Sequence, residues 1–466
     1  MKSRFAPSPT GLMTIGNART ALFSALLAWH KKGVFLLRIE DTDLARSEKT
    51  HQASIEQDLR WLGLQWQEGV DVGGSHGPYC QSERFGLYEQ YYQQLEAEGS
   101  AYPCFCSSQQ LELVRKVQLG QGQAPRYPGT CRSLSIAERE AKIAKGLTPA
   151  IRFKVPKGKM VVFDDLVKGT QRFAADDIGD FIIKKSDGSS SFMFCNAIDD
   201  ALMEVTDVMR GEDHLTNTPR QILILEALKL RVPVYGHISL INGSDGQKLS
   251  KRNGSRSIVD LREMGFLAIA VDNYLARLGA YYENNALMNM DELAAQFKVE
   301  GLSKSSARYD EQQLWHWQKL ALAQLDEEAI WQWMGSATQV LVPAEQKSLF
   351  IQTVRDNILF PKEAMEFAQM LFGDSFEIGV ELKEVVTTAG EAFFAAAVTA
   401  VEASGADFKA ISDHLTVSLG VKGKNLFQPL RVALTGQLHG PQMAGLVTLI
   451  AKERCIARFS AAKNNK

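Results

Sequence analysis

The sequence lacks the features that mark several protein classes. Six cysteines among 466 residues are too few and too scattered for a disulfide framework. No window approaches about 18 consecutive apolar residues, and the first residues contain no apolar segment of the secretory type. We therefore expect a cytoplasmic protein that is not associated with a membrane.

An excess of charge of either sign is also missing. The 52 basic and 54 acidic residues give a net charge of −2, which does not indicate nucleic-acid binding. It does not exclude such binding, because acidic residues elsewhere on a large protein can balance a basic face. Basic residues gather at 115–126 and at 422–431, and each group taken alone fits an ordinary solvated surface better than a binding site.

The composition that is present indicates a globular protein of several domains. Hydrophobic residues make up 45% of the chain and charged residues 23%, as in ordinary globular proteins. At about 150 residues per domain, the length predicts about three domains.

The first 40 residues predict a strand, a glycine-containing loop, a helix and a second strand. Apolar residues recur at helical spacing after Asn17, which we expect to be the N-cap of the helix. Val34 to Glu40 then has the pattern of a buried strand. This order of elements is the beginning of a doubly wound nucleotide-binding fold.

The pattern changes twice along the rest of the chain. Residues 100–192 contain a close cysteine pair, turns and β-like runs, and we expect them to form an insertion. From Phe192 to Ile241 strands alternate with a helix again, as expected for the second half of the same sheet. Beyond about residue 260 nearly every segment has helical spacing, which predicts an all-α C-terminal region.

Two loops carry residues suited to phosphate groups. The segment 11–17 precedes a helix, where backbone N–H groups bind anions, and its Thr14 and Asn17 add uncharged donors. Lys248 and Lys251 lie three residues apart in a second loop, and lysine ammonium groups suit a polyphosphate. Taken singly, the first loop fits a plain helix cap and the second a solvated basic turn. Together they favour a nucleotide-binding enzyme.

Longer motifs make the chain similar to a known family. It resembles the class I aminoacyl-tRNA synthetases, and most closely the bacterial glutamyl-tRNA synthetases, over nearly its whole length. The segments that carry the resemblance are Arg4–Gly11, Arg38–Asp43, Tyr102–Cys106, Asp199–Asp200, Arg210–His214, Lys248–Arg252 and Leu430–Gly436. Residues 14–17 stand where the family has its HIGH motif, and residues 248–252 where it has KMSKS. Thr14 replaces the first histidine of HIGH, which implies slower activation.

The resemblance implies a multidomain α/β fold. A Rossmann-like doubly wound parallel sheet would occupy residues 1–84 and 193–246, with an α+β tRNA acceptor-binding insertion at 85–192. A stem-contact domain with the Lys248–Arg252 loop would occupy residues 247–325. An all-helical anticodon-binding region would occupy residues 326–466, with a boundary between two subdomains near residue 375.

The resemblance also implies a reaction and its residues. Glutamate and ATP, with Mg²⁺, would form glutamyl adenylate and pyrophosphate, and the glutamyl group would pass to the 3′ end of tRNA. The residues assigned to catalysis are Thr14, Asn17, Lys248 and Lys251. Those assigned to ATP binding are Gly16, Asp213, Lys248 and Lys251, and those assigned to glutamate are Arg4, Ser8, Glu40, Asn196 and Arg210. Phe192 stands where we expect a tyrosine in relatives.

The cysteine pair marks a zinc site in many relatives. The ligands here would be Cys104, Cys106, Tyr127 and Cys131, because Ser133 stands where a histidine often supplies the fourth ligand. A set of three reduced thiols without a metal explains the same residues equally well.

The expected partners are glutamate tRNA and glutamate, and the expected state is a monomer. Phe427, Arg431 and Gln437 are candidates for reading anticodon bases, although each also fits a packing or surface role. Three alternatives remain. The chain could be another enzyme of the same nucleotide fold, a catalytically impaired relative with an RNA-binding or regulatory role, or a ligase that also charges glutamine tRNA with glutamate.

Overall fold

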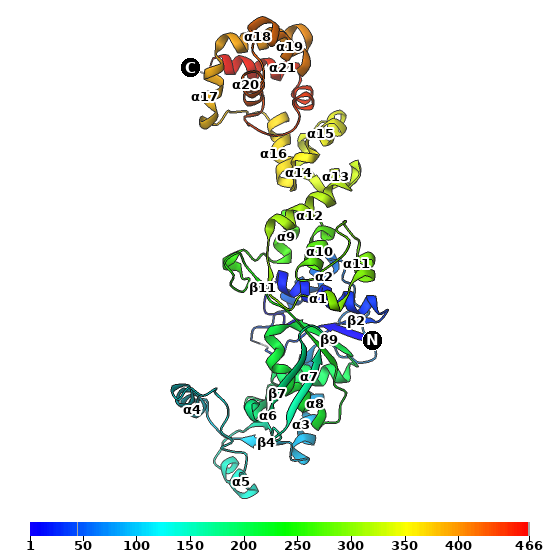
Figure 1. The fold of residues 1–466 in the computed structure, drawn as a ribbon, viewed down its shortest axis with the longest axis vertical. Helices are drawn as coiled ribbons and strands as arrows, with labels where there is room; N and C mark the ends of the chain where they lie inside the picture. The colour runs from blue at the N-terminus through cyan, green and yellow to red at the C-terminus, as the bar shows by residue number, and fades with distance from the viewer. Residues whose placement is uncertain (44, 465–466) are drawn as a thin grey trace. The chain divides into compact units, whose positions relative to one another are not determined.

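The computed structural model describes residues 1–43 and 45–464, apart from the side chain of Lys251. The chain divides into two compact units (Figure 1). The first contains Met1–Leu261 and Ala268–Leu314, and the second contains Arg262–Leu267 and Trp315–Lys466.

A five-stranded parallel sheet forms the centre of the first unit. Its strands, in spatial order, are β10 (Val234–Ile238), β9 (Asp207–Gly211), β1 (Lys2–Phe5), β2 (Val34–Leu37) and β3 (Glu68–Gly69). Lys2 pairs with Val34 on one side of β1, and Ser3 pairs with Asp207 on the other. The chain therefore builds the sheet outward from β1 in both directions, which confirms the doubly wound fold class predicted from the sequence.

The chain between and after these strands forms helices, of which the first packs directly on β1, β2 and β9. The helices are α1 (Ile15–His30), α2 (Lys49–Trp61), α3 (Phe85–Ala97), α7 (Phe192–Leu202) and α8 (Thr218–Ala227), joined by α9 (Ile258–Met264), α10 (Ala268–Arg277) and α11 (Met290–Gln296). Most of α1 is buried, because it packs against β1 and β9 on one side and against α10 and α11 on the other. Short strands β11 (Ile241–Asn242) and β12 (Ala307–Arg308) pair nearby.

The predicted insertion contains two antiparallel pieces. Strands β4 (Ala101–Cys104), β5 (Ala150–Phe153) and β8 (Phe181–Lys184) form one sheet, and β6 (Met160–Asp165) and β7 (Gly169–Ala174) form a hairpin followed by α6 (Ala175–Ile178). Helices α4 (Ser108–Gly120) and α5 (Ile136–Ala144) bury none of their residues and extend away from the strands (Figure 1). The hairpin instead packs on β10, where the Leu166 N–H donates to the Tyr235 carbonyl at 2.9 Å.

The second unit is helical, as the sequence predicted. Its helices are the end of α12 (Glu311–Ala323), α13 (Glu327–Met334), α14 (Ser336–Leu341), α15 (Lys347–Val354), α16 (Pro361–Phe372), α17 (Lys383–Ala389), α18 (Glu391–Ser404), α19 (Phe408–Leu419), α20 (Lys424–Thr435) and α21 (Met443–Lys463). One core runs through them and contains the buried rings of Phe350, Phe394 and Phe459. Helix α18 packs against both α19 and α21 (Figure 1).

Among the described residues, no single helix is long and apolar enough to span a membrane. The segments Val380–Ala389 and Glu391–Ser404 reach that length and apolar composition only when they are counted together, and they meet at an 83° bend.

Candidate functional site

A cavity of about 440 Å³ opens at the carboxyl ends of β1, β9 and β10. Its walls are the segment that follows β1, the first turn of α1, the residues after β9 and β10, and the loop at 248–250. This is the place where open parallel sheets bind ligands, beside the strand at which the winding direction reverses.

Most residues that the sequence assigned to the site line this cavity. They are Arg4, Ser8, Thr14, Gly16, Asn17, Glu40, Asn196, Arg210, Asp213 and Lys248. The backbone of Lys251 begins a short 3₁₀ helix in the same loop, but its side chain lies outside the described part of the chain. The three cysteines and Tyr127 lie apart from the cavity, in the insertion.

The first turn of α1 presents its backbone and two polar side chains to the cavity. Thr14, not Asn17, is the N-cap, because Thr14 has extended backbone angles and its Oγ1 accepts the Asn17 N–H at 3.2 Å. Asn17 lies inside the first turn. A Cβ added to Gly16 would meet only Thr14 Oγ1, at 3.8 Å, so the space above this glycine is open. The N–H groups of a first turn have no partner within the helix and remain available to an anion.

The second loop is held against this helix start. Thr14 forms a backbone bridge with Ser257, and the Ile258 N–H donates to the Met13 carbonyl at 3.0 Å. At the other end of the loop, Lys248 Nζ donates to Asp213 Oδ2 at 3.1 Å. Both predicted phosphate-binding loops therefore border one cavity.

A cluster of buried polar and charged groups adjoins the cavity, and its members Arg4, Glu40 and Asn196 line it. Asp200, on α7, accepts hydrogen bonds from Arg4 Nε and Nη2 at 3.1 and 3.2 Å and from Arg38 Nη1 at 2.8 Å. Arg38 also donates to Glu40 Oε1 at 3.0 Å, and Asn196 Nδ2 donates to the same oxygen at 2.7 Å. All five side chains are buried, so their charges depend on one another for stability.

The electrostatics of this cluster follow from burial and from its arginines. Burial alone would raise the pKa of Asp200, but Arg4 and Arg38 outweigh it and hold the pKa below its ordinary value of 3.8. Burial raises the pKa of Glu40, and Arg38 and Arg4 oppose the rise. Burial alone would lower the pKa of Arg38, but Asp200 and Glu40 outweigh it and raise the pKa, so this guanidinium stays charged.

Arg210 and His214 complete the cavity wall beside the end of β9. The guanidinium of Arg210 is buried, and its Nη1 has no hydrogen-bond partner among the described residues. Burial, with Arg210 nearby, lowers the pKa of His214 to about 4, so its imidazole is neutral at physiological pH. The ring of Phe192 lies 5.2 Å from that of His214 and adds an apolar surface to this wall.

Sequence reasoning missed the supporting layer of the site. Asp200 and Arg38 were parts of the family motifs but received no role, and Asp165, Gln221 and His237 were not singled out. A charged pair inside the apolar run of α7 was a usable signal, because buried carboxylates need cationic partners. The partners themselves come from segments that are distant in the sequence and could not be inferred from spacing.

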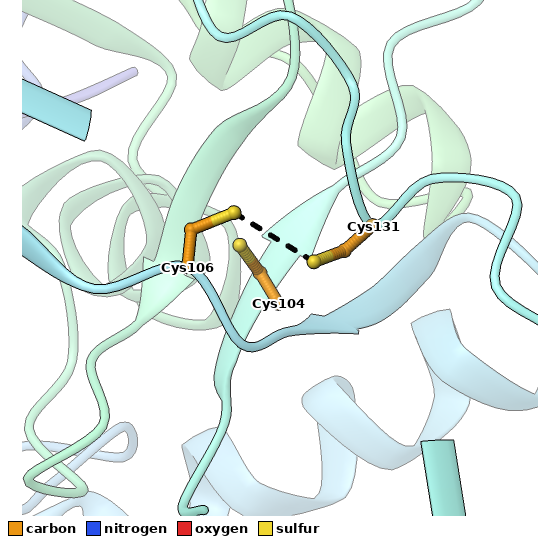
Figure 2. Close-up of side chains that lie close together, drawn as sticks. All are labelled: Cys104, Cys106 and Cys131. Atoms are coloured by element: carbon orange, nitrogen blue, oxygen red, sulfur yellow. Dashed lines mark hydrogen bonds between the residues drawn. The ribbon is translucent and has the colours of Figure 1, made fainter. Parts of the chain in front are cut away.

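The three predicted cysteine ligands converge (Figure 2). The Sγ atoms of Cys104, Cys106 and Cys131 lie within 4.8 Å of one another, and those of Cys106 and Cys131 are 3.7 Å apart. The Tyr127 hydroxyl lies 3.5 Å from both Cys104 Sγ and Cys106 Sγ. Arg152 Nε donates to Cys104 Sγ at 3.1 Å, and its guanidinium lies 3.7 Å from the centre of the Tyr127 ring.

The chain is similar to known proteins over its whole length. A family described as "tRNA synthetases class I (E and Q), catalytic domain" matches residues 1–316, and one described as "Anticodon binding domain" matches residues 312–463. Glutamate–tRNA ligase 1 of Coxiella burnetii is 53% identical over 462 residues, which is 99% of both chains. Glutamate–tRNA ligase 2 of Nitrosococcus oceani is 53% identical over 459 residues, 98% of this chain and 97% of that one.

Solved structures give the same result. The crystal structure of a glutamate tRNA ligase from Elizabethkingia meningosepticum, in complex with its amino acid, has a TM-score of 0.88 at 28% identity and covers 100% of both chains. That of the glutamate-tRNA synthetase from Elizabethkingia anophelis has a TM-score of 0.87 at 28% identity and covers 99% of both.

We predict that Asp200→Asn lowers the free energy of unfolding by about 3–5 kcal/mol, because it leaves two buried guanidiniums without their shared partner. Since the pKa of Asp200 is depressed in the folded state, its contribution is complete above about pH 4 and is lost as the pH falls through the folded pKa. Urea unfolding at about pH 7 and about pH 3.5 measures both effects, and the variant should lose less stability between the two pH values than the wild type.

The matched control is Asp177→Asn, which makes the same change at a side chain that is 84% exposed. It should leave the unfolding midpoint unchanged at both pH values. An Asp200→Asn variant with wild-type stability and wild-type pH dependence would contradict the assignment of Asp200 as the centre of the cluster.

Proposed function

The chain belongs to the class I tRNA synthetases for glutamate and glutamine, and on that premise we propose that it is a glutamate–tRNA ligase. It activates glutamate with ATP, which yields glutamyl adenylate and pyrophosphate, and it transfers the glutamyl group to the terminal ribose of tRNA. The relatives named glutamate–tRNA ligase support this proposal at 53% identity over almost the entire chain.

The observation that carries the proposal is the pair of guanidiniums in one cavity. Arg4 uses Nε and Nη2 to hold Asp200, and Arg210 has Nη1 without a partner among the described residues. Each arginine therefore keeps a nitrogen for a ligand, and a substrate with two carboxylates has a partner for each. Glu40 accepts hydrogen bonds from Arg38 and Asn196 at Oε1, and its carboxylate suits the α-ammonium group of glutamate.

The charge of the cavity also favours glutamate over glutamine. The buried groups that line the cavity include the cationic Arg4 and Arg210 and the anionic Glu40. Glutamate at neutral pH carries one net negative charge, whereas glutamine carries none. Glutamate can therefore place a second carboxylate against a guanidinium, which glutamine cannot do.

The opposite wall of the cavity suits the phosphates of ATP. The first turn of α1 offers backbone N–H groups at Gly16, and Lys248 supplies a positive charge that Asp213 holds at the cavity rim. Lys251, in the same loop, is the second lysine that we assign to ATP. Asn17 adds a side-chain amide on the exposed face of the first turn.

Thr14 retains a donor in place of the histidine that relatives carry. Its Oγ1 accepts the Asn17 N–H, and a hydroxyl that accepts a bond still has its own proton to give. Thr14 can therefore cap α1 and donate to a phosphate oxygen at the same time. This supports a working enzyme over a purely regulatory relative.

The mechanism needs no nucleophile from the protein. An oxygen of the glutamate carboxylate attacks the α-phosphorus of ATP and pyrophosphate leaves; then a hydroxyl of the terminal ribose attacks the acyl carbon and AMP leaves. Arg4, Arg210 and Glu40 orient glutamate, while the helix start and the lysine loop orient the phosphates and stabilise the charge that develops on them. Mg²⁺ accompanies ATP and helps to neutralise its phosphates. We expect activation to require bound tRNA.

We propose that the cysteine cluster binds one structural zinc ion. Tetrahedral ligands at a Zn–S distance of about 2.3 Å lie about 3.8 Å apart, and Cys106 and Cys131 Sγ are separated by 3.7 Å. The Tyr127 hydroxyl supplies an oxygen at the fourth position. Arg152 offsets the negative charge that three thiolates and a phenolate bring to the site.

The remaining parts are assigned to tRNA. We propose residues 1–84 and 193–246 as the catalytic domain, 85–192 as the acceptor-binding domain, 247–325 as the stem-contact domain and 326–466 as the anticodon-binding region, divided near residue 375. Phe427 and Arg431 lie one turn apart on α20, and Phe427 is 46% exposed, which suits stacking on an unpaired base.

We expect the enzyme to act as a monomer in the cytoplasm, where tRNA is charged.

Purified enzyme tests the main proposal in a charging assay with glutamate or glutamine and with glutamate tRNA or glutamine tRNA. We expect efficient glutamylation of glutamate tRNA and no use of glutamine. Exchange of pyrophosphate into ATP should appear only when tRNA is present. Charging of glutamine tRNA with glutamate would widen the substrate range, and an absence of exchange under every condition would favour the regulatory alternative.

A lysine variant tests the assignment of the second loop. Lys248→Ala should lower kcat/KM for ATP by about 10²–10³-fold, because it removes a cation from the phosphate site. Lys298→Ala is the matched control, since both lysine side chains are 63% exposed and each pairs with one carboxylate, but Lys298 lies outside the cavity. Equal kinetics for the two variants would remove Lys248 from the site.

Metal analysis tests the cysteine cluster. We expect about one zinc ion per chain in the wild type and a loss of nearly all zinc from Cys131→Ser. Cys80→Ser is the control, because Cys80 is a free cysteine outside the cluster and should leave the zinc content unchanged. A wild-type protein without zinc, purified with no chelator, would establish the three residues as reduced thiols.

A further inference from the structure

Asp165, at the end of β6, is buried against the catalytic sheet although it belongs to the insertion. Its Oδ1 accepts the N–H groups of Val167 and Lys168 at 2.9 and 2.8 Å, within the hairpin turn. Its Oδ2 lies 2.5 Å from Nδ1 of His237, on β10. Both side chains are completely buried. The hairpin therefore contacts the sheet through a charged group as well as through apolar packing.

The hydrogen bonds of His237 determine where its proton lies. Arg210 Nε, which can only donate, lies 3.2 Å from His237 Nε2, so Nε2 must accept. The hydroxyl of Thr218 is 2.9 Å from the same nitrogen. The proton of the neutral ring must then be on Nδ1, and Nδ1–H donates to Asp165. Asp165 thereby selects the His237 tautomer whose Nε2 can accept a hydrogen bond from Arg210 Nε.

Three contacts fix the guanidinium of Arg210. His237 Nε2 accepts a hydrogen bond from Arg210 Nε, and Thr218 Oγ1 accepts one from Arg210 Nη2 at 2.7 Å. The centre of the Tyr235 ring lies 5.0 Å from the guanidinium carbon. Nη1 is the nitrogen that remains without a partner among the described residues, and Arg210 lines the cavity. These contacts fix the orientation of the planar guanidinium and leave the two N–H groups of Nη1 available to a ligand.

We propose that Asp165 and His237 are positioning residues that hold Arg210 in the orientation in which it binds a carboxylate of glutamate. This inference rests on the proposed function. It makes the β6–β7 hairpin of the insertion a part of the amino-acid site. Lys168 of the same hairpin forms an ion pair with Glu212, whose Oε1 accepts the Leu240 N–H at 2.9 Å, and so holds the hairpin at a second point.

The charges around His237 explain why a neutral imidazole stands between Asp165 and Arg210. Burial lowers the pKa of Arg210 to about 10, which leaves it charged at neutral pH. Burial also lowers the pKa of His237, and the charge of Arg210 adds to this effect while Asp165 opposes it. A second cation facing Arg210 is thereby avoided. A carboxylate placed directly on Arg210 would compete with the substrate, whereas a neutral acceptor orients the group and leaves its charge for the ligand.

The experiment compares two isosteric variants of His237 in the charging assay. A glutamine amide oxygen reaches the position of Nε2 and can accept from Arg210, whereas an asparagine reaches only the position of Nδ1. His237→Asn should raise KM for glutamate about tenfold or more, and His237→Gln should raise it by less than about threefold. KM for ATP should change by less than about twofold in both, since we assign Arg210 to glutamate and not to the phosphates.

Asp165→Asn provides an independent test. Its backbone contacts occupy the amide oxygen, so the NH₂ group faces His237 Nδ1 and drives the proton to Nε2, against Arg210. KM for glutamate should rise about tenfold or more. Asp164→Asn is the control, because it makes the same change one residue earlier on the same strand. Its exposed carboxylate bonds, among the described residues, only to Thr170 within the hairpin.

The outcomes separate the inference from the function on which it rests. A wild type that does not charge tRNA with glutamate overturns the proposed function. A wild type that does, with KM for glutamate unchanged in His237→Asn and Asp165→Asn, overturns the inference alone. Equal rises in KM for glutamate and ATP would mean a general structural role and would also overturn it. If Asp165→Asn does not fold, the two His237 variants still decide the question.

Discussion

The shared carboxylate of Asp200 is the interaction on which the site depends. It joins Arg4 at the end of β1 to Arg38 just after β2, and it comes from α7, which is 196 residues from the first of them and 162 from the second. Neighbouring Asp199 makes a similar cluster with Arg84, Gln81 and Tyr88. Two adjacent acids on one buried helix therefore connect both halves of the sheet, and the cavity exists only when both halves have assembled.

The fold and the two phosphate-binding loops could be predicted because they depend on local patterns, whereas most of the other residues that line the cavity were assigned from the resemblance to the synthetases. Strand, glycine loop and helix follow one another in the first 40 residues, and the carboxyl ends of parallel strands meet at one edge. The N-cap predicted for α1, Asn17, was wrong by three residues. Thr14 and Asn17 are both good capping residues, and the extended backbone at Thr14, which pairs with Ser257 from a distant loop, decides between them.

The supporting layer could not be predicted from the sequence. Asp165 and His237 are separated by 72 residues and belong to segments with no shared motif. Each has an ordinary local explanation, a turn aspartate and a strand histidine. Only the packing of the hairpin on β10 brings together these two residues, for which we propose a positioning role. The cysteine cluster was easier, because the spacing of Cys104 and Cys106, at and just after the end of β4, is recognisable in the sequence.

The buried carboxylate of the hairpin also limits how this protein can be shortened or recombined. An insertion that only touched tRNA could be deleted, or exchanged for that of a relative, with amino-acid recognition intact. Here the excised segment would take Asp165 with it and expose the Nδ1 edge of a completely buried imidazole. If Asp165 has the role proposed for it, a minimal catalytic core of this enzyme must retain the β6–β7 hairpin, and a chimera must keep an aspartate opposite His237.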